Sequence, residues 1–417
     1  MSSLIVAGGV PLSGSCRIGG AKNAALPILA ACMLLDRPVR LIDCPRLKDV
    51  DNMLRILKTL GCRAAYEGGE LLVDASAAGG YELPELLTKS LRSSVFLLGP
   101  LLARFGRAAI AYPGGCEIGH RPIDLHIKGL QRLNAKISER AGCICCETAG
   151  LRGADIHLDY PSVGATENIM MAAVAAEGRT VIRNAAREPE ICALQDFLCA
   201  AGFQVMGAGS SSVTIQGGGS AQAVRFAIMP DRIVAGTLLA AAAITGGELR
   251  LTNVVPEHLA GTLAKLMECG CEISMEPEAL RLAAPARPSE IKLIETLPHP
   301  GFPTDMQAQM FALCTVARGT SVIVENVFEN RFKHAQELAK MGADCTVRGR
   351  MAVIRGVEKL HGAHVSARDL RGGAALTLAA LRARGESMVS NAELIDRGYE
   401  GFDEMLRALG AVITREA

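Results

Sequence analysis

The sequence predicts an α/β protein built from repeats of one helix–turn–strand pattern. Six leucine-rich helix ends each lead through a turn residue into a short β-like run. Their turn residues are spaced 73, 68, 68, 72 and 68 positions apart, which is too regular for chance. The segments are LKTLGCRAAY, LQRLNAKIS, LCAAGFQVM, LMECGCEIS, LAKMGADCTV and LRALGAVIT.

Each of these six segments turns at Gly or Asn. These two residues most readily adopt the left-handed conformation that ends a helix. A repeat of about 70 residues is too long for ankyrin or tetratricopeptide units, which are near 33 to 34. The turn residues are Gly61, Asn134, Gly202, Gly270, Gly342 and Gly410.

Within a repeat, we expect an alanine-rich helix, then a strand, then the second helix. The helical stretches are apolar and lack turn residues, and the strands are rich in β-branched residues. Examples of the helices are 21–34, 165–178 and 305–319, and examples of the strands are 179–185, 247–254 and 320–327.

Six mixed α/β units suggest two domains of three. The Gly/Ser-rich stretch 207–220 lies near the midpoint of the chain, where a domain boundary is expected. The apolar segment 4–9 precedes the first full unit. We expect it to pair as a strand with the C-terminal half, which makes that domain discontinuous.

Composition excludes several classes of protein. The 417 residues carry a net charge of +1, no Trp and 4% aromatic residues, so no basic stripe favours nucleic acid or an anionic membrane. The beginning lacks a signal-peptide pattern, and the apolar stretch 233–245 is too short to span a bilayer. These features favour a cytoplasmic protein without membrane spans.

The 14 cysteines are expected to be reduced, and no metal site is expected. Most lie in apolar runs, where Cys behaves as a small hydrophobe. The stretch 143–146 has a C-x-x-C spacing, but a structural zinc site needs a second such pair or a His pair. Cys269 and Cys271 are separated by a single residue.

One cysteine differs from the others. Cys116 follows two glycines in AYPGGCEIGHRP, beside Glu117, His120 and Arg121. Neighbouring cations lower the pKa of a thiol, and glycines free the backbone to present it. We therefore expect Cys116 to be reactive.

A second glycine pair precedes Lys22 in GGAKN. The phosphate-binding pattern of nucleoside triphosphatases requires Lys directly after the last Gly and then Ser or Thr. Here Ala21 separates the glycines from Lys22, and Asn23 follows. A nucleoside triphosphatase is therefore disfavoured.

Ten motifs in order resemble the enolpyruvyl transferase family over essentially the whole chain. They are GGAKNAALPIL, LRSS, PGGCEIGHRPIDLHIKG, PSVGATENIM, AAREPEI, PDRI, FPTDMQAQ, FENRF, DLRGGAAL and IDRGYE. The resemblance implies a two-domain inside-out α/β barrel, with three pseudo-repeated β/α units in each domain, six in all, and the active site in the interdomain cleft. It implies that 22–229 form one domain, and that 1–21 with 230–417 form the other.

The resemblance also implies a reaction. The enolpyruvyl group of phosphoenolpyruvate is transferred to the 3-hydroxyl of UDP-N-acetylglucosamine through a tetrahedral intermediate, and phosphate is released. This is the first committed step of peptidoglycan synthesis. The implied partners are these two small molecules, no cofactor is implied, and the oligomeric state stays open.

The resemblance assigns catalytic roles to five residues. Cys116 is the general acid that protonates the methylene carbon, and Asp305 is the base that accepts the proton of the hydroxyl. An alternative for Asp305, from local sequence, is the cap of a helix that starts after Pro303. The other residues in the catalytic set are Lys22, Arg397 and Asp369.

Substrate contacts are implied in the same way. The two anionic groups of phosphoenolpyruvate need fixed cations, and the residues implied are Lys22, Asn23, Arg121, Arg331, Arg371 and Arg397. A helix expected to open at Ala165 would offer free N–H groups to diphosphate. Contacts to UDP-N-acetylglucosamine are implied for Asn23, Arg92, Arg121, Pro122, Ile123, Asp124, Leu125, His126, Ser162, Val163, Gly164, Asp305 and Val327.

Two departures and two alternatives remain. Tyr160 stands where some members carry Lys, which puts one diphosphate contact in doubt, and Val234 stands where an acidic residue is common. The sister enzyme that makes 5-enolpyruvylshikimate 3-phosphate is disfavoured by LRSS and by Cys116. A non-catalytic role, such as a duplicate copy or binding of RNA ends, is the other alternative.

Overall fold

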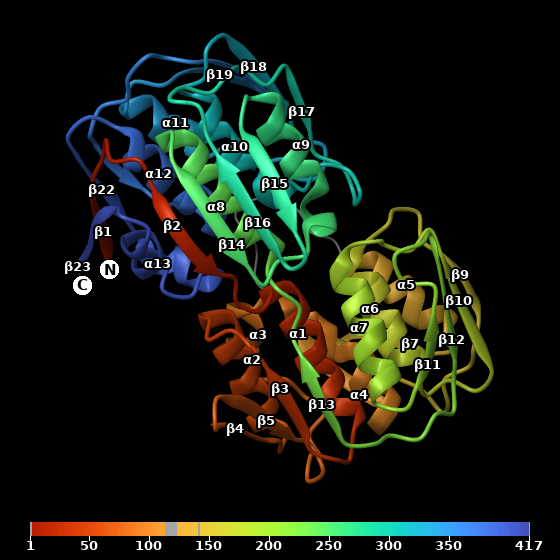
Figure 1. Ribbon diagram of the computed structural model, residues 1–417. Coiled ribbons are helices and arrows are strands. Elements are labelled where there is room, and N and C mark those ends of the chain that lie inside the picture. Colours follow the sequence, from red (N-terminus) through yellow and green to blue (C-terminus); the bar gives the residue numbers. More distant parts are fainter. Residues whose placement is uncertain (1, 113–122, 141, 417) are drawn as a thin grey trace. The chain divides into compact units, whose positions relative to one another are not determined.

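The computed structural model describes residues 2–112, 123–140 and 142–416. The described chain divides into two compact units, each with its own hydrophobic core (Figure 1). The middle unit comprises 20–112 and 123–229, and the flanking unit comprises 2–19 and 230–416. Both units alternate helices with strands, so the predicted α/β class is confirmed.

Three sheets belong to the middle unit within the described residues. Their strand orders are β13-β3-β5-β4, β6-β8-β7 and β11-β12-β10-β9. Because β13 pairs in parallel with β3, the last strand of the unit lies beside its first. The strands are β3 (Val39–Ile42), β4 (Arg63–Glu67), β5 (Glu70–Asp74), β6 (Arg107–Ala111), β7 (Lys136–Arg140), β8 (Cys143–Glu147), β9 (Asp155–His157), β10 (Arg179–Arg183), β11 (Gln204–Met206), β12 (Ser212–Gln216) and β13 (Val224–Ala227).

The flanking unit also contains three sheets in its described part. Their orders are β15-β16-β14-β2, β17-β18-β20-β19 and β21-β22-β1-β23. The strands are β1 (Ser3–Ala7), β2 (Ser13–Arg17), β14 (Glu248–Thr252), β15 (Glu272–Glu276), β16 (Ala279–Ala283), β17 (Leu293–Glu295), β18 (Thr320–Val324), β19 (Asp344–Arg348), β20 (Met351–Arg355), β21 (His364–Ser366), β22 (Glu386–Ser390) and β23 (Val412–Glu416).

The N-terminal strand pairs with the end of the chain, as expected from sequence. β1 is antiparallel to both β22 and β23, with Leu4 opposite Val389 on one side and Arg415 on the other. In Figure 1 the red strand β1 lies among the blue C-terminal strands. β2 continues into the neighbouring sheet, where it pairs in parallel with β14.

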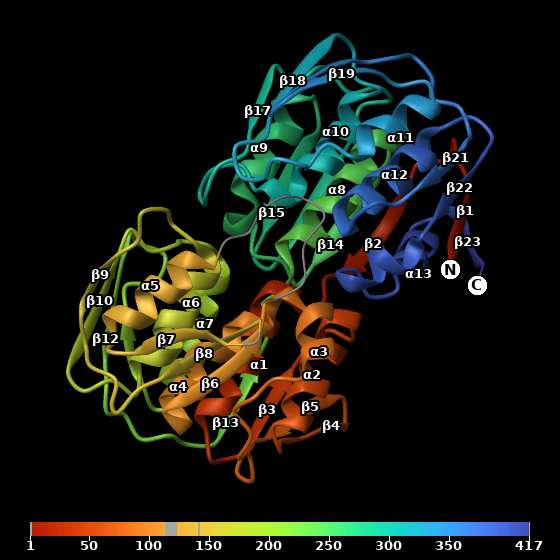
Figure 2. The ribbon, with the colours of Figure 1, turned by 180° about the vertical axis from the view of Figure 1, so that it is seen from behind.

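The alanine-rich helices are largely buried. In α8, every residue from Ile233 to Thr245 is buried, which explains why this stretch is apolar on all sides. α8, α10 and α12 contact one another within the flanking unit (Figure 2). No described helix is long and apolar enough to cross a membrane. The buried helices are α1 (Lys22–Ala31), α4 (Leu98–Phe105), α6 (Val163–Ala173), α8 (Arg232–Thr245), α10 (Gln307–Cys314) and α12 (Leu370–Arg382).

The second helix of each repeat ends at one of the predicted turns. All six turn residues have φ between 71° and 98°, so the left-handed turns are confirmed. These helices are α2 (Lys48–Thr59), α5 (Asp124–Arg132), α7 (Pro189–Ala200), α9 (Ala260–Glu268), α11 (His334–Lys340) and α13 (Phe402–Ala408). The remaining short helices are α3 (Glu85–Ser90), η1 (Cys32–Leu34), η2 (Arg92–Leu97), η3 (Pro256–Leu259), η4 (Thr304–Met306) and η5 (Ala392–Arg397).

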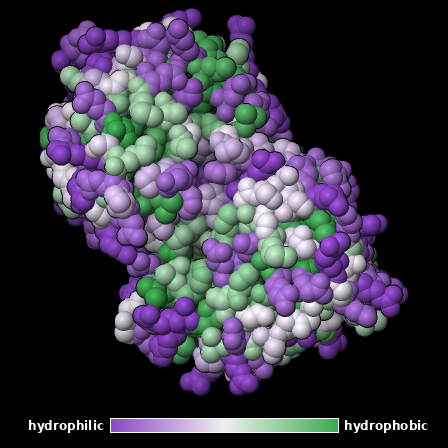
Figure 3. Space-filling model, turned by 45° about the vertical axis from the view of Figure 1, so that its right-hand side comes forward, coloured by the Kyte–Doolittle hydropathy of each residue, from purple (hydrophilic) through white to green (hydrophobic). Residues whose placement is uncertain are grey.

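The surface is mixed in polarity. On the face shown in Figure 3, purple hydrophilic residues are spread widely and green hydrophobic residues form small groups. Single exposed apolar side chains of this kind, such as Leu86 at 84% exposure, are ordinary for a folded protein.

Candidate active site

The predicted site residues divide between the two units. Cys116, Arg121 and Pro122 lie outside the described residues. The middle unit carries Lys22, Asn23, Arg92, Ile123, Asp124, Leu125, His126, Ser162, Val163 and Gly164. The flanking unit carries Asp305, Val327, Arg331, Asp369, Arg371 and Arg397.

Asp305 lies in η4 and is held by two arginines. Arg331 Nη2 donates to Asp305 Oδ1 at 2.6 Å, and Arg371 Nη2 lies 3.1 Å from Oδ2. The arginine side chains are 3% and 4% exposed, whereas that of Asp305 is 27% exposed. The alternative that Asp305 caps a helix is wrong, because neither η4 nor α10 has a side-chain cap. Its carboxylate instead partners two buried cations.

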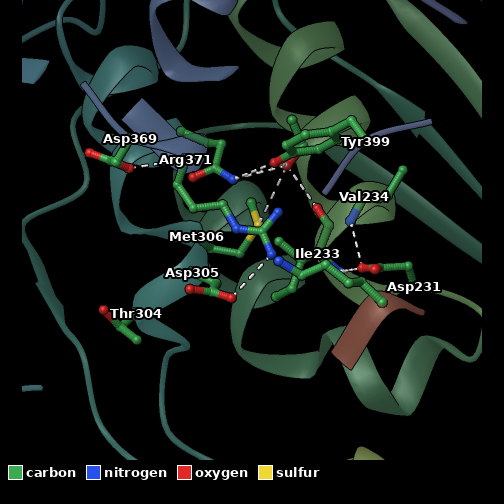
Figure 4. A network of polar contacts seen from close by, with 12 residues as sticks. Asp231, Ile233, Val234, Thr304, Asp305, Met306, Asp369, Arg371 and Tyr399 are labelled. Atoms are coloured by element: carbon green, nitrogen blue, oxygen red, sulfur yellow. Dashed lines mark hydrogen bonds and ion pairs between the residues drawn. The ribbon is translucent and has the colours of Figure 1, made fainter. Parts of the chain in front are cut away.

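Arg371 is fixed at the start of α12. The N-cap of this helix is Asp369, whose Oδ1 accepts from the backbone N–H groups of Arg371 and Gly372 at 3.0 and 2.9 Å. Burial alone lowers the pKa of Arg371, but Tyr399, Asp305 and Asp231 outweigh it and raise the pKa. Arg371 is therefore a permanent cation despite its burial. Its side chain points toward Asp305 (Figure 4).

A buried polar network lies behind Arg371. The guanidinium carbon of Arg371 is 5.3 Å from the centre of the Tyr399 ring. The Tyr399 hydroxyl is 2.9 Å from Thr237 Oγ1, and Gln309 Nε2 donates to both at 3.2 and 3.0 Å (Figure 4). Thr237 and Gln309 come from α8 and α10. Two helices thus support the position of Arg371 beside Asp305.

Several buried polar atoms of this cluster have no hydrogen-bond partner among the described residues. They are Arg331 Nε, Arg371 Nη1, Asp369 Oδ2 and both ring nitrogens of His334. Burial lowers the pKa of His334 to about 4, an effect reinforced by Arg331 and partly opposed by Asp369. His334 is therefore neutral at pH 7. Buried polar groups are costly when unpaired, so these atoms favour a polar ligand or ordered water.

Arg397 and Val327 lie on connections after strands. Arg397 ends η5, between β22 and α13, and Arg331 lies between β18 and α11. Arg397 and Arg331 thus each follow a strand and precede a helix, and connections of this kind often carry functional residues. The backbone N–H of Val327 donates to Glu325 Oε1 at 2.9 Å.

Lys22 is the first residue of α1 and pairs with a carboxylate. Its Nζ lies 3.3 Å from Asp49 Oδ2, and the two side chains are 12% and 5% exposed. Asp49 is on α2 and was not among the predicted site residues. Asn23 follows on α1 and is half-buried. The pair holds Lys22 while its side chain stays partly accessible.

The N-terminus of α6 begins at Val163, two residues before the expected start at Ala165. Ser162 is the N-cap, and its Oγ accepts from the N–H of Ala165 at 3.3 Å. Gly164 is tightly enclosed. A Cβ placed there would lie 3.0 Å from Phe96 and 3.1 Å from His126. A larger residue at Gly164 would therefore require Phe96 or His126 to shift.

His126 is buried against α6. Asn168 Nδ2 lies 3.0 Å from its Nδ1 and also donates to the Val95 carbonyl oxygen. Burial, reinforced by the charge of Arg92, lowers the pKa of His126 to about 4. His126 is therefore neutral at pH 7. Because the amide nitrogen of Asn168 is a donor, Nδ1 accepts and Nε2 carries the proton.

Of the remaining predicted residues of this unit, Arg92 begins η2, and three lie at the start of α5. Asp124 is exposed and Leu125 half-buried, whereas Ile123 is buried. Of the two departures, Tyr160 is 45% exposed and lies just before α6. Val234 is 9% exposed on α8, and its N–H donates to Asp231.

The cysteines of the described chain are all free. Burial raises the pKa of Cys146 and of Cys314 to about 12, so neither is a reactive thiolate near neutral pH. Among the residues that the structure describes, no group of three His, Cys, Asp or Glu side chains is placed to hold a metal ion.

Comparison with known proteins places the chain in a family. The model of the EPSP synthase (3-phosphoshikimate 1-carboxyvinyltransferase) family matches residues 6–406. The UDP-N-acetylglucosamine 1-carboxyvinyltransferase 2 of Caldanaerobacter subterraneus subsp. tengcongensis is 49% identical over 415 residues, covering 100% of both chains. The UDP-N-acetylglucosamine 1-carboxyvinyltransferase of Myxococcus xanthus is 49% identical over 419 residues, again covering 100% of both.

Solved structures agree with this placement. The enolpyruvyl transferase NikO from Streptomyces tendae superposes with a TM-score of 0.88 at 26% identity, covering 99% of this chain and 98% of that one. EPSP synthase from Acinetobacter baumannii, at 19% identity and a TM-score of 0.77, covers 100% of both chains and shares the fold. The chain therefore belongs to the enolpyruvyl transferase family and groups within it with the UDP-N-acetylglucosamine 1-carboxyvinyltransferases.

Proposed function

We propose that the protein transfers the enolpyruvyl group of phosphoenolpyruvate to the 3-hydroxyl of UDP-N-acetylglucosamine and releases phosphate. This reaction supplies the first committed precursor of peptidoglycan. It takes place in the cytoplasm and needs no cofactor. Full-length relatives with this activity in their names support the assignment, and the shikimate pathway enzyme is not favoured.

The observation that carries the proposal is the cluster around Asp305. One carboxylate faces two buried guanidinium groups, so the three side chains together keep one excess positive charge. Arg331 and Arg371 also retain N–H atoms with no partner among the described residues. Such a cluster suits phosphoenolpyruvate, whose phosphate and carboxylate accept bidentate hydrogen bonds. Lys22, Arg121 and Arg397 complete the proposed cationic set.

The proposed chemistry is an addition followed by an elimination. The 3-hydroxyl oxygen bonds to C2 of phosphoenolpyruvate while its proton passes to Asp305, and the thiol of Cys116 gives a proton to C3. The tetrahedral intermediate then loses a proton from C3 and expels phosphate, which restores the double bond. Asp369, with one buried carboxylate oxygen unpaired among the described residues, assists these proton transfers.

The nucleotide-sugar is proposed to contact residues of the middle unit, together with Asp305 and Val327 of the flanking unit. The N-terminus of α6 offers N–H groups and a helix dipole to the diphosphate. The other proposed contacts in the described chain are Asn23, Arg92, Ile123, Asp124, Leu125, His126, Ser162, Val163, Gly164, Asp305 and Val327. For the architecture, we infer the six-unit inside-out barrel, with domains 22–229 and 1–21 plus 230–417.

The test is phosphate release by the purified protein from phosphoenolpyruvate. Release that requires UDP-N-acetylglucosamine, with the enolpyruvyl ether identified by mass spectrometry, is the expected result. Release with shikimate 3-phosphate instead would identify the sister activity. No release with either acceptor would overturn the assignment as an enzyme.

A further inference from the structure

We propose that Glu325 is a positioning residue. It holds the turn that carries Asp305 at a fixed position relative to the loop that carries Val327. The inference rests on the proposed function, because it concerns alignment of the proposed base. Glu325 was not among the residues singled out from sequence. It directly follows β18, and its side chain is fully buried.

The contacts of Glu325 use both carboxylate oxygens. Oε1 accepts from Thr296 Oγ1 at 2.9 Å and from the N–H groups of Val327 and Phe328 at 2.9 and 3.0 Å. Oε2 accepts from Thr304 Oγ1 at 2.9 Å. Three of the four donors thus contact Oε1 and one contacts Oε2, so both oxygens of the carboxylate are engaged.

These contacts join three segments that are separate in the sequence. Thr304 is the residue before Asp305 in η4, Thr296 follows β17, and Val327 lies two residues beyond Glu325. The Thr296 N–H donates to the Val324 carbonyl oxygen at 3.0 Å, and the Glu325 N–H donates to the Arg350 carbonyl oxygen at 2.8 Å. Glu325 is thus anchored to the sheet on one side and to the turn of Asp305 on the other.

The second attachment of this turn comes from the arginines. Arg331 Nη2 lies 3.4 Å from the Thr304 carbonyl oxygen and 2.6 Å from Asp305 Oδ1, and Arg371 reaches Oδ2. The two guanidinium groups fix the carboxylate of Asp305, whereas Glu325 fixes the backbone before Asp305 through its hydrogen bond from Thr304. Alignment of a base within hydrogen-bond reach requires both its side chain and its backbone to be fixed.

Stability alone does not account for a carboxylate at this position. Burial of an ionised group costs free energy even when it is hydrogen-bonded, and its four donors here are two hydroxyls and two amides. The arrangement does, however, fix two backbone amides and two threonine side chains at once. That geometric role links η4 to the loop that leads to Arg331.

The test separates the effect of the Thr304 hydroxyl from the effect of the shape of its side chain. Thr304→Val keeps the volume but removes the donor to Glu325, whereas Thr304→Ser keeps the donor. We expect Thr304→Val to lower kcat about tenfold, because the loss of one hydrogen bond that aligns Asp305 corresponds to about that factor in rate. We expect kcat of Thr304→Ser to stay within about twofold of wild type. Glu325→Gln, which loses one acceptor, should also lower kcat.

Thr315→Val is the matched control. Thr315 is a buried threonine at the end of α10, whereas Thr304 is half-buried, and Thr315 Oγ1 donates to the Ala312 carbonyl oxygen at 2.6 Å. Its replacement should lower the melting temperature without changing kcat or the KM for either substrate. Unchanged kcat in Thr304→Val, or equal losses in Thr304→Ser and Thr304→Val, would overturn the positioning role.

A crystal structure of Thr304→Val gives a readout that does not depend on turnover. We expect the Asp305 carboxylate to move away from the hydrogen-bond distance to Arg331 or Arg371. A carboxylate that keeps both contacts, with η4 unmoved, would overturn the inference. If wild type shows no phosphate release, the proposed function fails on that assay alone, and this structure still decides whether Glu325 positions Asp305.

Discussion

The role proposed for Asp305 sets two requirements that conflict in water. A base must be ionised, and a site for phosphoenolpyruvate must be cationic. Arg331 and Arg371 suit both proposed roles, because two guanidinium groups contact one carboxylate and stabilise its charge. Their burial strengthens these interactions relative to the surface.

Asp305→Asn should reduce turnover about 10²- to 10⁴-fold, because an amide cannot accept the proton of the hydroxyl. The variant also turns an NH₂ group toward one of two buried arginines. Phosphate release and thermal melting measure the two effects. The control is Asp344→Asn, since Asp344 pairs at 3.4 Å with Arg355 on an exposed surface. Activity within twofold of wild type in Asp305→Asn would exclude it as the base.

Cys116 should be the thiol that an epoxide of the fosfomycin type alkylates, and Cys116→Ala should abolish or sharply reduce turnover. Buried thiols such as Cys146 and Cys314 have raised pKa values and should not react. The exposed Cys199 is the competitor to monitor. Peptide mass spectrometry locates the label, and a label on another cysteine would contradict the assignment.

At the scale of elements, α6 brings several proposed contacts together. Ser162, Val163 and Gly164 at its capped N-terminus are half-buried, and Gly164 permits the close approach of Phe96 and His126. The helix is otherwise buried from Ala165 to Ala173. A buried helix with an accessible start places its N–H groups firmly.

Gly164→Ala should weaken binding of the nucleotide-sugar. A Cβ at 3.0 to 3.2 Å from Phe96 and His126 must push one of them aside. We expect the KM for UDP-N-acetylglucosamine to rise about tenfold, equivalent to about 1.4 kcal/mol, with a smaller change for phosphoenolpyruvate. Gly79→Ala is the control, since a Cβ at Gly79 meets open space. Equal KM values in both variants would contradict a role for this end of α6.

The buried His126 should make stability depend on pH. The unfolded chain protonates this residue near pH 6.5 and the folded chain only near pH 4. Between these values the unfolded state binds more protons, so the stabilisation present above pH 6.5 is lost as the pH falls toward 4. The loss at pH 5 is about 2 kcal/mol from His126 alone.

His126→Gln keeps an acceptor for Asn168 but does not titrate. Although it lowers stability overall, its loss of stability between pH 7 and pH 5 should be smaller than in wild type. Urea unfolding at both pH values measures this. An identical loss in the two proteins would show that His126 is not the titrating group.

The elements were predictable where the cause is local. A left-handed turn after each leucine-rich helix depends on one Gly or Asn, and all six were found. The start of α6 was misplaced by two residues because the cap at Ser162 extends the helix upstream. Asp305 as a helix cap was wrong, since two arginines distant in sequence compete for its carboxylate.

The rest of the site depends on contacts that no local pattern reveals. Thr237 and Tyr399 are 162 positions apart, and Asn168 and His126 are 42 apart. Asp49 and Glu325 are ordinary acidic residues in the sequence, and only folding brings them to Lys22 and Thr304. The motifs of the family identified residues proposed to touch substrate but not those that hold them.

For the whole molecule, β1 is the element whose loss should do most damage. It is central in its sheet, with β22 on one side and β23 on the other. Deletion of residues 1–7 should leave the flanking unit unfolded, because β23 loses its one strand partner, β22 loses one of two, and Leu4 and Val6 leave the core.

Limited proteolysis and hydrogen exchange test this expectation unit by unit. The middle unit, which has its own core, should stay protected while the flanking unit becomes labile. A truncated chain with full protection of 230–416 would contradict the central role of β1. Deletion of Met1 alone is the control.

The pairing of β1 also dictates an order of events on the ribosome. β1 leaves the exit tunnel long before its two neighbours, which are complete only when 386–416 have been translated. In the meantime both of its edges stay open, which is the condition under which strands pair wrongly or recruit chaperones. A protein with this connectivity begins its flanking unit first and completes it last, after the whole middle unit has had time to form.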